Sequence, residues 1–367
     1  LDGQAMQRTQ IIEWITKHHP RDRGIVYCAT KNDAYEVATA LFENEIKKYS
    51  VGLYYGNLER DKKEQLHQMW RSGRVQVIVA TNAFGMGINS LDVRFVLHYT
   101  APKSVENYYQ ESGRAGRDGQ PADCVLFYRS LDSSKLAGWG FDGQAIDGLS
   151  KAHAMINYAE CRHVCRKVLL QSYLEGTSGR VDALQGLLND KDLLHNPNHG
   201  IAPCSNCDIC QKQKQPLSID CTAAAITMVN IIYAAGTERV TLLKMCKYFK
   251  GHGLNKAPEI AALADRNLAT FVKMQSDDVG FIANRLISLG VLAETFDHSG
   301  YTTNAYLGIA DQYRHLVGRT VDQTQGLGPF VIMFTADAPP KGMQTTDGTI
   351  PTAPASPVLV DSDSDEN

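Results

Sequence analysis

The first 130 residues alternate between short apolar runs and longer helix-like stretches, and this alternation constrains the fold more than any other feature. Five of the apolar runs have the length of a strand: Gly24–Cys28, Val51–Tyr55, Val75–Ala80, Val93–Tyr99 and Asp123–Tyr128. The stretches between them that are typical of helices are Asp33–Lys48, Glu59–Arg71 and Val105–Ser112. Strands and helices in alternation predict an α/β unit, a parallel sheet with helices on both faces.

The pattern changes downstream of residue 130, where helices and then a strand pair are expected. Ala152–Leu174 has helical periodicity, and Gly176–Pro203 is an insertion that contains Gly, Asn and His residues. Past Pro216 the sequence predicts three helices and two strands in the order Thr222–Ala235, Thr241–Phe249, Asp277–Leu289, Val291–Phe296 and Tyr301–Leu307. Three helices followed by a hairpin are the order of a winged helix.

The net charge of −3 averages over an uneven distribution. The segment from Ala336 to Asn367 holds six acidic residues and one lysine, so the remainder of the chain carries +2 and permits a polyanionic partner. The chain contains no run of eighteen apolar residues, so no membrane-spanning helix is expected. It starts at Leu1 without the pattern of a signal peptide, and we expect a fragment of a longer protein.

The strongest functional signal is the run Tyr108–Gly119, which reads YYQESGRAGRDG. If this run is helical, Gln110, Arg114 and Arg117 lie above one another on a single face. Two guanidinium groups with glycine neighbours are suited to bidentate binding of phosphate. The alternative is a solvated charged helix, which has no need of two glycines that weaken it.

A second signal follows directly after the apolar run that ends at Ala80. Thr81–Asn89 reads TNAFGMGIN and places a hydroxyl group and a Gly-x-Gly turn at the end of a buried strand. Phosphates bind at this carboxyl edge of α/β sheets, through hydroxyl and backbone N–H groups. A Gly-x-Gly alone is most often only a tight turn, so its weight comes from its position just ahead of the arginine motif.

Together these runs resemble motifs of superfamily 2 helicases, and most closely those of the RecQ family of DNA helicases. AFGMGIN and YYQESGRAGRDG resemble motifs V and VI, and GIVYCAT resembles motif IV. The resemblance extends from about Arg8 to Gly308. One departure is the sequence Tyr54-Tyr55-Gly56-Asn57, where the family usually has Tyr-His-Ala-Gly.

The resemblance implies both an architecture and an activity. The implied parts are a second RecA-like helicase lobe at 1–130, a helical zinc-binding module with an insertion at 131–216, a winged-helix DNA-binding domain at 217–335 and a disordered acidic tail at 336–367. The implied activity is that of an ATP-dependent DNA helicase that moves 3′ to 5′ and unwinds duplex DNA. A nuclear location is expected with it.

The resemblance also implies roles at the nucleotide. Arg117 is expected to be the arginine finger that reaches the γ-phosphate of ATP, with Arg114 and Gln110 supporting it. Gly87 and Asn89 are expected to contact the nucleotide together with the two arginines.

The sequence contains neither a Gly-x-x-x-x-Gly-Lys-Ser/Thr loop nor an Asp-Glu-x-His box. Those motifs hold the nucleotide phosphates and Mg²⁺. ATP and Mg²⁺ are therefore expected only together with a missing N-terminal lobe, and this chain alone should not hydrolyse ATP. The alternative is a non-catalytic DNA-binding scaffold that keeps a zinc site and a winged helix without a working motor.

Cys204, Cys207 and Cys210 follow one another at a spacing typical of metal ligands, and Cys165 lies upstream in CRKVLLQSYLEG. Four thiolates satisfy the tetrahedral preference of Zn²⁺. Cys161, one helical turn before Cys165, is a rival first ligand. The similarity of Cys165 and its neighbours to the RecQ zinc module favours Cys165, and structural zinc is favoured over a redox role.

DNA contacts are expected at two places. By the same resemblance, Thr81 and the neighbouring amides would hold DNA phosphates. The hairpin offers Phe296, His298 and Tyr301, and in RecQ-like helicases an aromatic tip residue is a wedge that splits the duplex. Base–aromatic stacking contributes roughly 1–3 kcal/mol, comparable to one base-pair step. Alternating aromatic residues on a strand are about as often core residues.

The tail contains one more candidate site. Val358-Leu359-Val360 is a short apolar run that is followed directly by the acidic stretch Asp361–Glu366. This order resembles SUMO-interacting motifs, in which such a run adds as a strand to the edge of a sheet. The alternative is a solubilising tail with three chance aliphatic residues.

Overall fold

Five parallel strands form one sheet in the computed structural model, in the order β2-β3-β1-β4-β5. The strands are β1 (Arg23–Tyr27), β2 (Val51–Tyr54), β3 (Val77–Ala80), β4 (Val93–His98) and β5 (Asp123–Leu126). Each strand overlaps the apolar run that predicted it, so the expected parallel α/β unit is confirmed. The structure describes residues 3–43, 49–84, 90–142, 147–176, 203–212, 217–253, 273–300, 302–320, 330–334 and 343.

Helices cover both faces of this sheet, because its central strands are buried along most of their length. α1 (Gly3–His18) and α2 (Lys31–Phe42) pack on one face through Ile11, Ile15 and Leu41. α3 (Arg60–Arg71) packs on the other face through Trp70. The sequence predicted α2 and α3, whereas α1 was not predicted.

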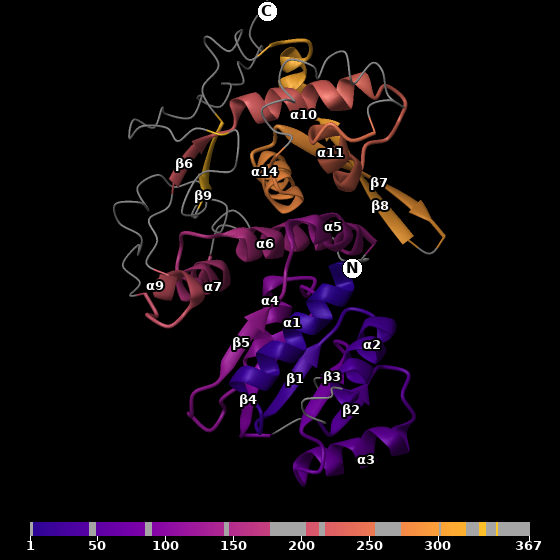
Figure 1. The fold of residues 1–367 in the computed structure, drawn as a ribbon, viewed down its shortest axis with the longest axis vertical. Coiled ribbons are helices and arrows are strands. Elements are labelled where there is room, and N and C mark those ends of the chain that lie inside the picture. Colours follow the sequence, from indigo (N-terminus) through magenta and orange to yellow (C-terminus); the bar gives the residue numbers. More distant parts are fainter. Residues whose placement is uncertain are drawn as a thin grey trace, which may run out of the picture.

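A layer of helices lies between the sheet and the C-terminal part of the chain (Figure 1). It contains α4 (Val105–Ser112), the 3₁₀ turn η1 (Ser130–Asp132), α5 (Ser133–Asp142), α6 (Gly148–Glu160), α7 (Arg166–Glu175) and the short α9 (Asp208–Lys212). These helices share one buried cluster to which α4 contributes Val105 and Tyr108. Of the helices in the described part of the chain, none is both long enough and apolar enough to cross a membrane.

The predicted single helix Ala152–Leu174 is wrong, because α6 and α7 are separate helices. The backbone is extended at Cys161, which ends α6, and at Cys165, which precedes α7. Periodicity could not detect so short a break, since both helices bury their apolar residues in the same cluster.

α5 also escaped prediction, since its sequence contains two glycines, which weaken an isolated helix. Both are required by close packing. A Cβ atom on Gly140 would lie 2.7 Å from the Cβ atom of Ala152 in α6, and one on Gly138 would lie 3.0 Å from the carbonyl oxygen of Thr303. The glycines therefore allow α6 and the C-terminal hairpin to approach α5 on two sides.

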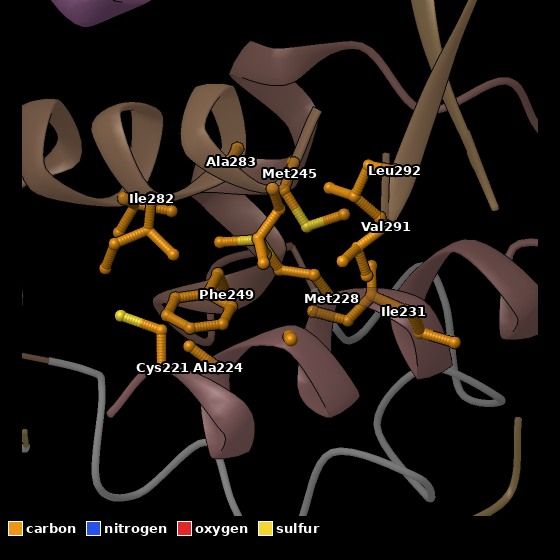
Figure 2. Close-up of a cluster of buried hydrophobic side chains, with 14 of the residues drawn as sticks. Cys221, Ala224, Met228, Ile231, Met245, Phe249, Ile282, Ala283, Val291 and Leu292 are labelled. Atoms are coloured by element: carbon orange, nitrogen blue, oxygen red, sulfur yellow. The ribbon is translucent and has the colours of Figure 1, made fainter. Parts of the chain in front are cut away.

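The C-terminal part has the predicted winged-helix order. Its elements are β6 (Leu217–Asp220), α10 (Thr222–Ala234), α11 (Leu242–Phe249), α14 (Ser276–Ser288), β7 (Leu292–Ser299), β8 (Thr302–Ile309), η4 (Asp311–Leu316) and β9 (Val331–Phe334). Figure 2 shows its core, where Met228, Met245 and Phe249 lie beside Ile282 and Val291. The antiparallel pair β6–β9 was not predicted. Met343, inside the segment expected to be a tail, is buried with its Sδ atom 4.0 Å from the Sγ atom of Cys221.

A buried polar cluster joins the three parts of the chain. The Glu160 carboxylate accepts hydrogen bonds from the Tyr128 hydroxyl at 2.9 Å and from the Asn284 amide at 2.7 Å. The Asn284 amide also donates to the carbonyl of Ser130 at 3.0 Å, and the Ser130 amide donates to the Asp277 carboxylate at 2.7 Å. The winged helix is therefore fixed to the helical layer by specific hydrogen bonds as well as by apolar packing.

Glu160→Gln should make the protein more stable at alkaline pH relative to the wild type. Burial raises the pKa of Glu160 from 4.5 to about 7, against the hydrogen bonds from Asn284 and Tyr128 that lower it. Between these two pH values the folded state therefore holds a proton that the unfolded chain has released, and wild-type stability falls as pH rises. Glutamine does not titrate, so the stability of the variant relative to the wild type should grow by roughly 2–3 kcal/mol between pH 4.5 and pH 8.

The measurement is the free energy of unfolding at the two pH values, with Glu13→Gln, an exposed acid on α1, as the matched control. A pH dependence that is the same for Glu160→Gln and for the wild type would show that Glu160 is ionised throughout this range.

Candidate functional site

The arginine motif forms a series of turns, and the predicted helical face of Gln110, Arg114 and Arg117 is wrong. α4 ends at Ser112, and only Gln110 of the three lies in it. Gly116 has a φ of +63°, and its amide donates to the carbonyl of Val93 at 2.9 Å. A Cβ atom there would lie 2.9 Å from the carbonyl oxygen of Gln120, so only glycine permits this tight return to the sheet.

Arg94 on β4 holds the end of this turn against the sheet. Its guanidinium donates to both carboxylate oxygens of Asp118 at 2.6 Å and to the carbonyl of Pro121 at 3.1 Å. The hydrogen bond from Arg94 lowers the pKa of Asp118, so the carboxylate stays ionised at neutral pH. The turn that carries Arg114 and Arg117 is therefore anchored at both ends.

Arg114 and Arg117 both lie near Tyr27 at the end of β1. Burial raises the pKa of the Tyr27 hydroxyl, while the charge of Arg114, a hydrogen bond to Arg114 and the charge of Arg117 oppose the rise. The Nε atom of Arg117 donates to the carbonyl of Gly113 at 3.2 Å, and Arg117 is exposed. The two arginines thus present permanent positive charge beside each other, one partly buried and one open to an anionic ligand.

A buried contact between His98 and Glu111 joins β4 to α4, just before the same turn. The Nε2 atom of His98, on β4, lies 2.8 Å from a carboxylate oxygen of Glu111 in α4. The His98 ring stacks on Tyr27 with centroids 5.3 Å apart and is fully buried. His98, Glu111 and Tyr27 were not among the expected site residues; Tyr27 lies in GIVYCAT and Glu111 in YYQESGRAGRDG, whereas His98 lies in no motif.

Thr81 follows β3 directly and is nearly buried. Its amide donates to the carbonyl of Tyr54 at 3.1 Å, and its carbonyl accepts from the amide of Phe84 at 3.0 Å. The Tyr27 hydroxyl donates to the carbonyl of Phe84 at 2.9 Å. The turn after β3 is therefore bonded to the residue that Arg114 also contacts. Gly87 and Asn89 lie outside the described residues.

The structure brings Cys165, Cys204, Cys207 and Cys210 together, with their sulfur atoms all within 4.8 Å of one another. The backbone amides of Cys204, Cys207 and Cys210 lie 3.3–3.5 Å from the sulfur atoms of Cys165, Cys204 and Cys207, respectively. Amide groups that point at sulfur stabilise the thiolate form that a metal requires. Four sulfur ligands at this separation fit a tetrahedral Zn²⁺ ion.

The rival ligand Cys161 is not part of this group. It is buried, and its Sγ atom lies 3.9 Å from the Nδ1 atom of His163. Arg166, directly after Cys165, forms a two-pronged ion pair with Asp208 at 3.0 and 3.1 Å. This ion pair holds α7 and α9 in the arrangement that gathers the four cysteines.

The hairpin β7–β8 turns at Gly300, and Phe296 is not at its tip. Phe296 pairs with Ala305 and stacks on Phe141 of α5, with centroids 4.5 Å apart and an interplanar angle of 14°. His298 is nearer the tip and exposed, with its Nδ1 atom 3.0 Å from the Thr303 hydroxyl. Tyr301 lies outside the described residues, as does the tail with Val358-Leu359-Val360.

The sequence is similar to those of several known proteins. Residues 6–119 match the family described as the helicase conserved C-terminal domain. ATP-dependent DNA helicase Q-like 2 of Arabidopsis thaliana is 31% identical over 299 residues, 81% of this chain and 37% of that protein. RecQ-like DNA helicase blm-1 of Caenorhabditis elegans is 30% identical over 266 residues, 70% of this chain and 25% of that protein.

Among solved structures, the C-terminal domain of the DEAD-box protein Dbp5 is similar at 24% identity and a TM-score of 0.31, over 34% of this chain and 70% of that one. The chain spans well under half the length of the two curated relatives.

Proposed function

Because the chain belongs to the RecQ family of DNA helicases, as a C-terminal half, we propose that it is the rear part of an ATP-driven motor that unwinds duplex DNA. In this proposal residues 1–130 are the second motor lobe, 131–216 the zinc-binding module, 217–335 the winged helix and 336–367 an acidic tail. The motor moves 3′ to 5′ on DNA in the nucleus, and the tail binds SUMO.

The observation that carries the proposal is the meeting of two anion-binding turns at Tyr27. Arg114 and Arg117 lie in one turn, and Thr81 begins the other. Arg117 is the finger that reaches the γ-phosphate of ATP held by an N-terminal lobe, with Arg114 and Gln110 in support. Thr81 holds a DNA phosphate. In this proposal one lobe contacts ATP and DNA at adjacent places.

The four-cysteine group supports a structural role for zinc in the same protein. Cys165 would bind Zn²⁺ from the start of α7, and the other three cysteines would bind it from the 204–210 segment. The ion would supply a cross-link between these segments and no chemistry on the substrate.

The test is unwinding by the complete protein on duplexes with either a 3′ or a 5′ single-stranded tail. We expect ATP-dependent strand separation with the 3′ tail and little with the 5′ tail. Tyr301→Ala and His298→Ala should reduce strand separation by about tenfold, the loss of one base-stacking contact, and leave DNA-stimulated ATP turnover within about twofold.

Thr295→Ala changes an exposed residue of β7, the strand that contains His298, and is the matched control for the hairpin variants. Complete protein that binds ATP and DNA without separating strands would instead favour the non-catalytic scaffold. Equal losses of turnover and strand separation in the hairpin variants would argue against a wedge.

A further inference from the structure

The Tyr27 hydroxyl is a buried group that none of the roles above uses. It lies at the end of the central strand β1 and is bonded to two turns that are far apart in sequence. On one side it donates to the carbonyl of Phe84 at 2.9 Å, and on the other it contacts the guanidinium of Arg114.

The first turn is rigidly connected to Thr81. The backbone amide of Phe84 donates to the carbonyl of Thr81, and the backbone carbonyl of Phe84 accepts from the Tyr27 hydroxyl. Thr81 and Tyr27 are therefore both hydrogen-bonded to the backbone of Phe84. The Phe84 ring is buried and packs edge-on against Tyr54, with centroids 4.8 Å apart. A displacement of Thr81 is therefore transmitted to the Phe84 carbonyl and to the hydroxyl that it binds.

The second turn has limited freedom as well. Arg94 holds its far end through Asp118, and Gly116 is bonded to Val93. Between these anchors the Arg114 side chain is the part that contacts Tyr27. The Tyr27 ring also stacks on the buried His98 ring, with centroids 5.3 Å apart, which restricts movement of the phenol.

We propose that Tyr27 is a positioning residue that couples DNA binding at Thr81 to the placement of Arg114 and Arg117 at ATP. The inference rests on the proposed function, since it assigns DNA to the Thr81 turn and nucleotide to the arginine turn. DNA that seats on Thr81 fixes the Phe84 carbonyl, the carbonyl fixes the Tyr27 hydroxyl, and the hydroxyl orients Arg114. Tyr27 touches neither ligand, so its effect is on the coupling between them.

The test is ATP turnover by the complete protein with and without a single-stranded oligothymidine. In Tyr27→Phe the ring remains and only the hydroxyl is lost. The ratio of DNA-stimulated to DNA-free turnover should fall about tenfold, the effect of one hydrogen bond to a charged group. The affinity for the oligonucleotide should stay within about twofold, because the contact with DNA is not altered.

Tyr49→Phe is the matched control, because it removes another buried tyrosine hydroxyl of the same lobe, which donates to Thr16 at 3.2 Å. It should leave the ratio unchanged. All rates are taken at a temperature at which circular dichroism shows both variants folded, so a purely structural role cannot mimic the result. Wild-type protein that DNA does not stimulate would contradict the proposed function. Stimulation that is equal in the wild type and Tyr27→Phe would overturn the inference alone.

Discussion

Replacing Arg117 by alanine in the complete protein should lower ATP turnover by about a thousandfold or more, while the affinities for ATP and DNA stay within about threefold. Arg117 is exposed on the anchored turn after α4, and its Nε atom donates to the carbonyl of Gly113. An exposed guanidinium on a fixed turn can meet a phosphate that an N-terminal lobe presents. A finger stabilises the charge of the transition state, so its loss affects turnover far more than binding.

Arg117→Lys should still lose more than about tenfold, since an ammonium group keeps the charge but not the planar fork. Arg71→Ala, at the exposed end of α3 in the same lobe, is the matched control and should be active. Turnover is measured at saturating ATP and DNA, and nucleotide affinity by titration with a fluorescent analogue. Near-normal turnover in Arg117→Ala would remove this residue from the finger role.

Zinc removal should produce the second large effect. The purified protein should contain one zinc per chain, and either a chelator or Cys207→Ser should lower the free energy of unfolding by at least about 3 kcal/mol. The reason is that three of the four ligands lie in a short segment, 204–210, so the ion would tie this segment to Cys165 at the start of α7, beside the Arg166–Asp208 ion pair. Metal content is measured by mass spectrometry and stability by denaturant titration.

Cys161→Ser and Cys124→Ser are the matched controls, and Cys165→Ser tests the fourth ligand. Cys161→Ser should keep its zinc, because Cys161 lies outside the four-sulfur group, whereas Cys165→Ser should lose it. Cys124→Ser changes an exposed residue on β5, away from the four cysteines, and should leave the metal content unchanged. Protein without metal, or zinc retained in Cys207→Ser, would contradict the assignment.

The five strands of the parallel sheet and the winged-helix order were predictable, because their signals are local. Every residue of β3 is buried and apolar, so this strand could be predicted without knowing which strands pair with it. The helices of the middle layer were harder. α5 contains Gly138 and Gly140, which allow α6 and β8 to pack closely against it. The sequence alone does not show these contacts.

The candidate site shows the same division. The residue types and spacing of Arg114 and Arg117 indicated a phosphate site, and the helix Val105–Ser112 was predicted with the observed bounds. The shared helical face does not form, because the chain leaves the helix after Ser112 and Gly116 takes a left-handed conformation with its amide bonded to Val93. The hydrogen bond from the Tyr27 hydroxyl to the Phe84 carbonyl joins residues that are 57 positions apart, and periodicity cannot predict such a contact. Phe296 looked like a tip residue because strand ends shift by a few residues, and the observed strand β7 continues to Ser299.

The polar cluster around Asn284 affects how the protein unfolds. Separating α14 from the helical layer would leave the Glu160 carboxylate, the Ser130 amide and the Asp277 carboxylate without these partners. Each buried polar group stranded in this way costs about 1–3 kcal/mol, so partial separation is disfavoured. The winged helix and the cysteine-bearing helices should therefore denature as one cooperative unit, with the Ser130 amide exchanging its hydrogen as slowly as the amides of the apolar core.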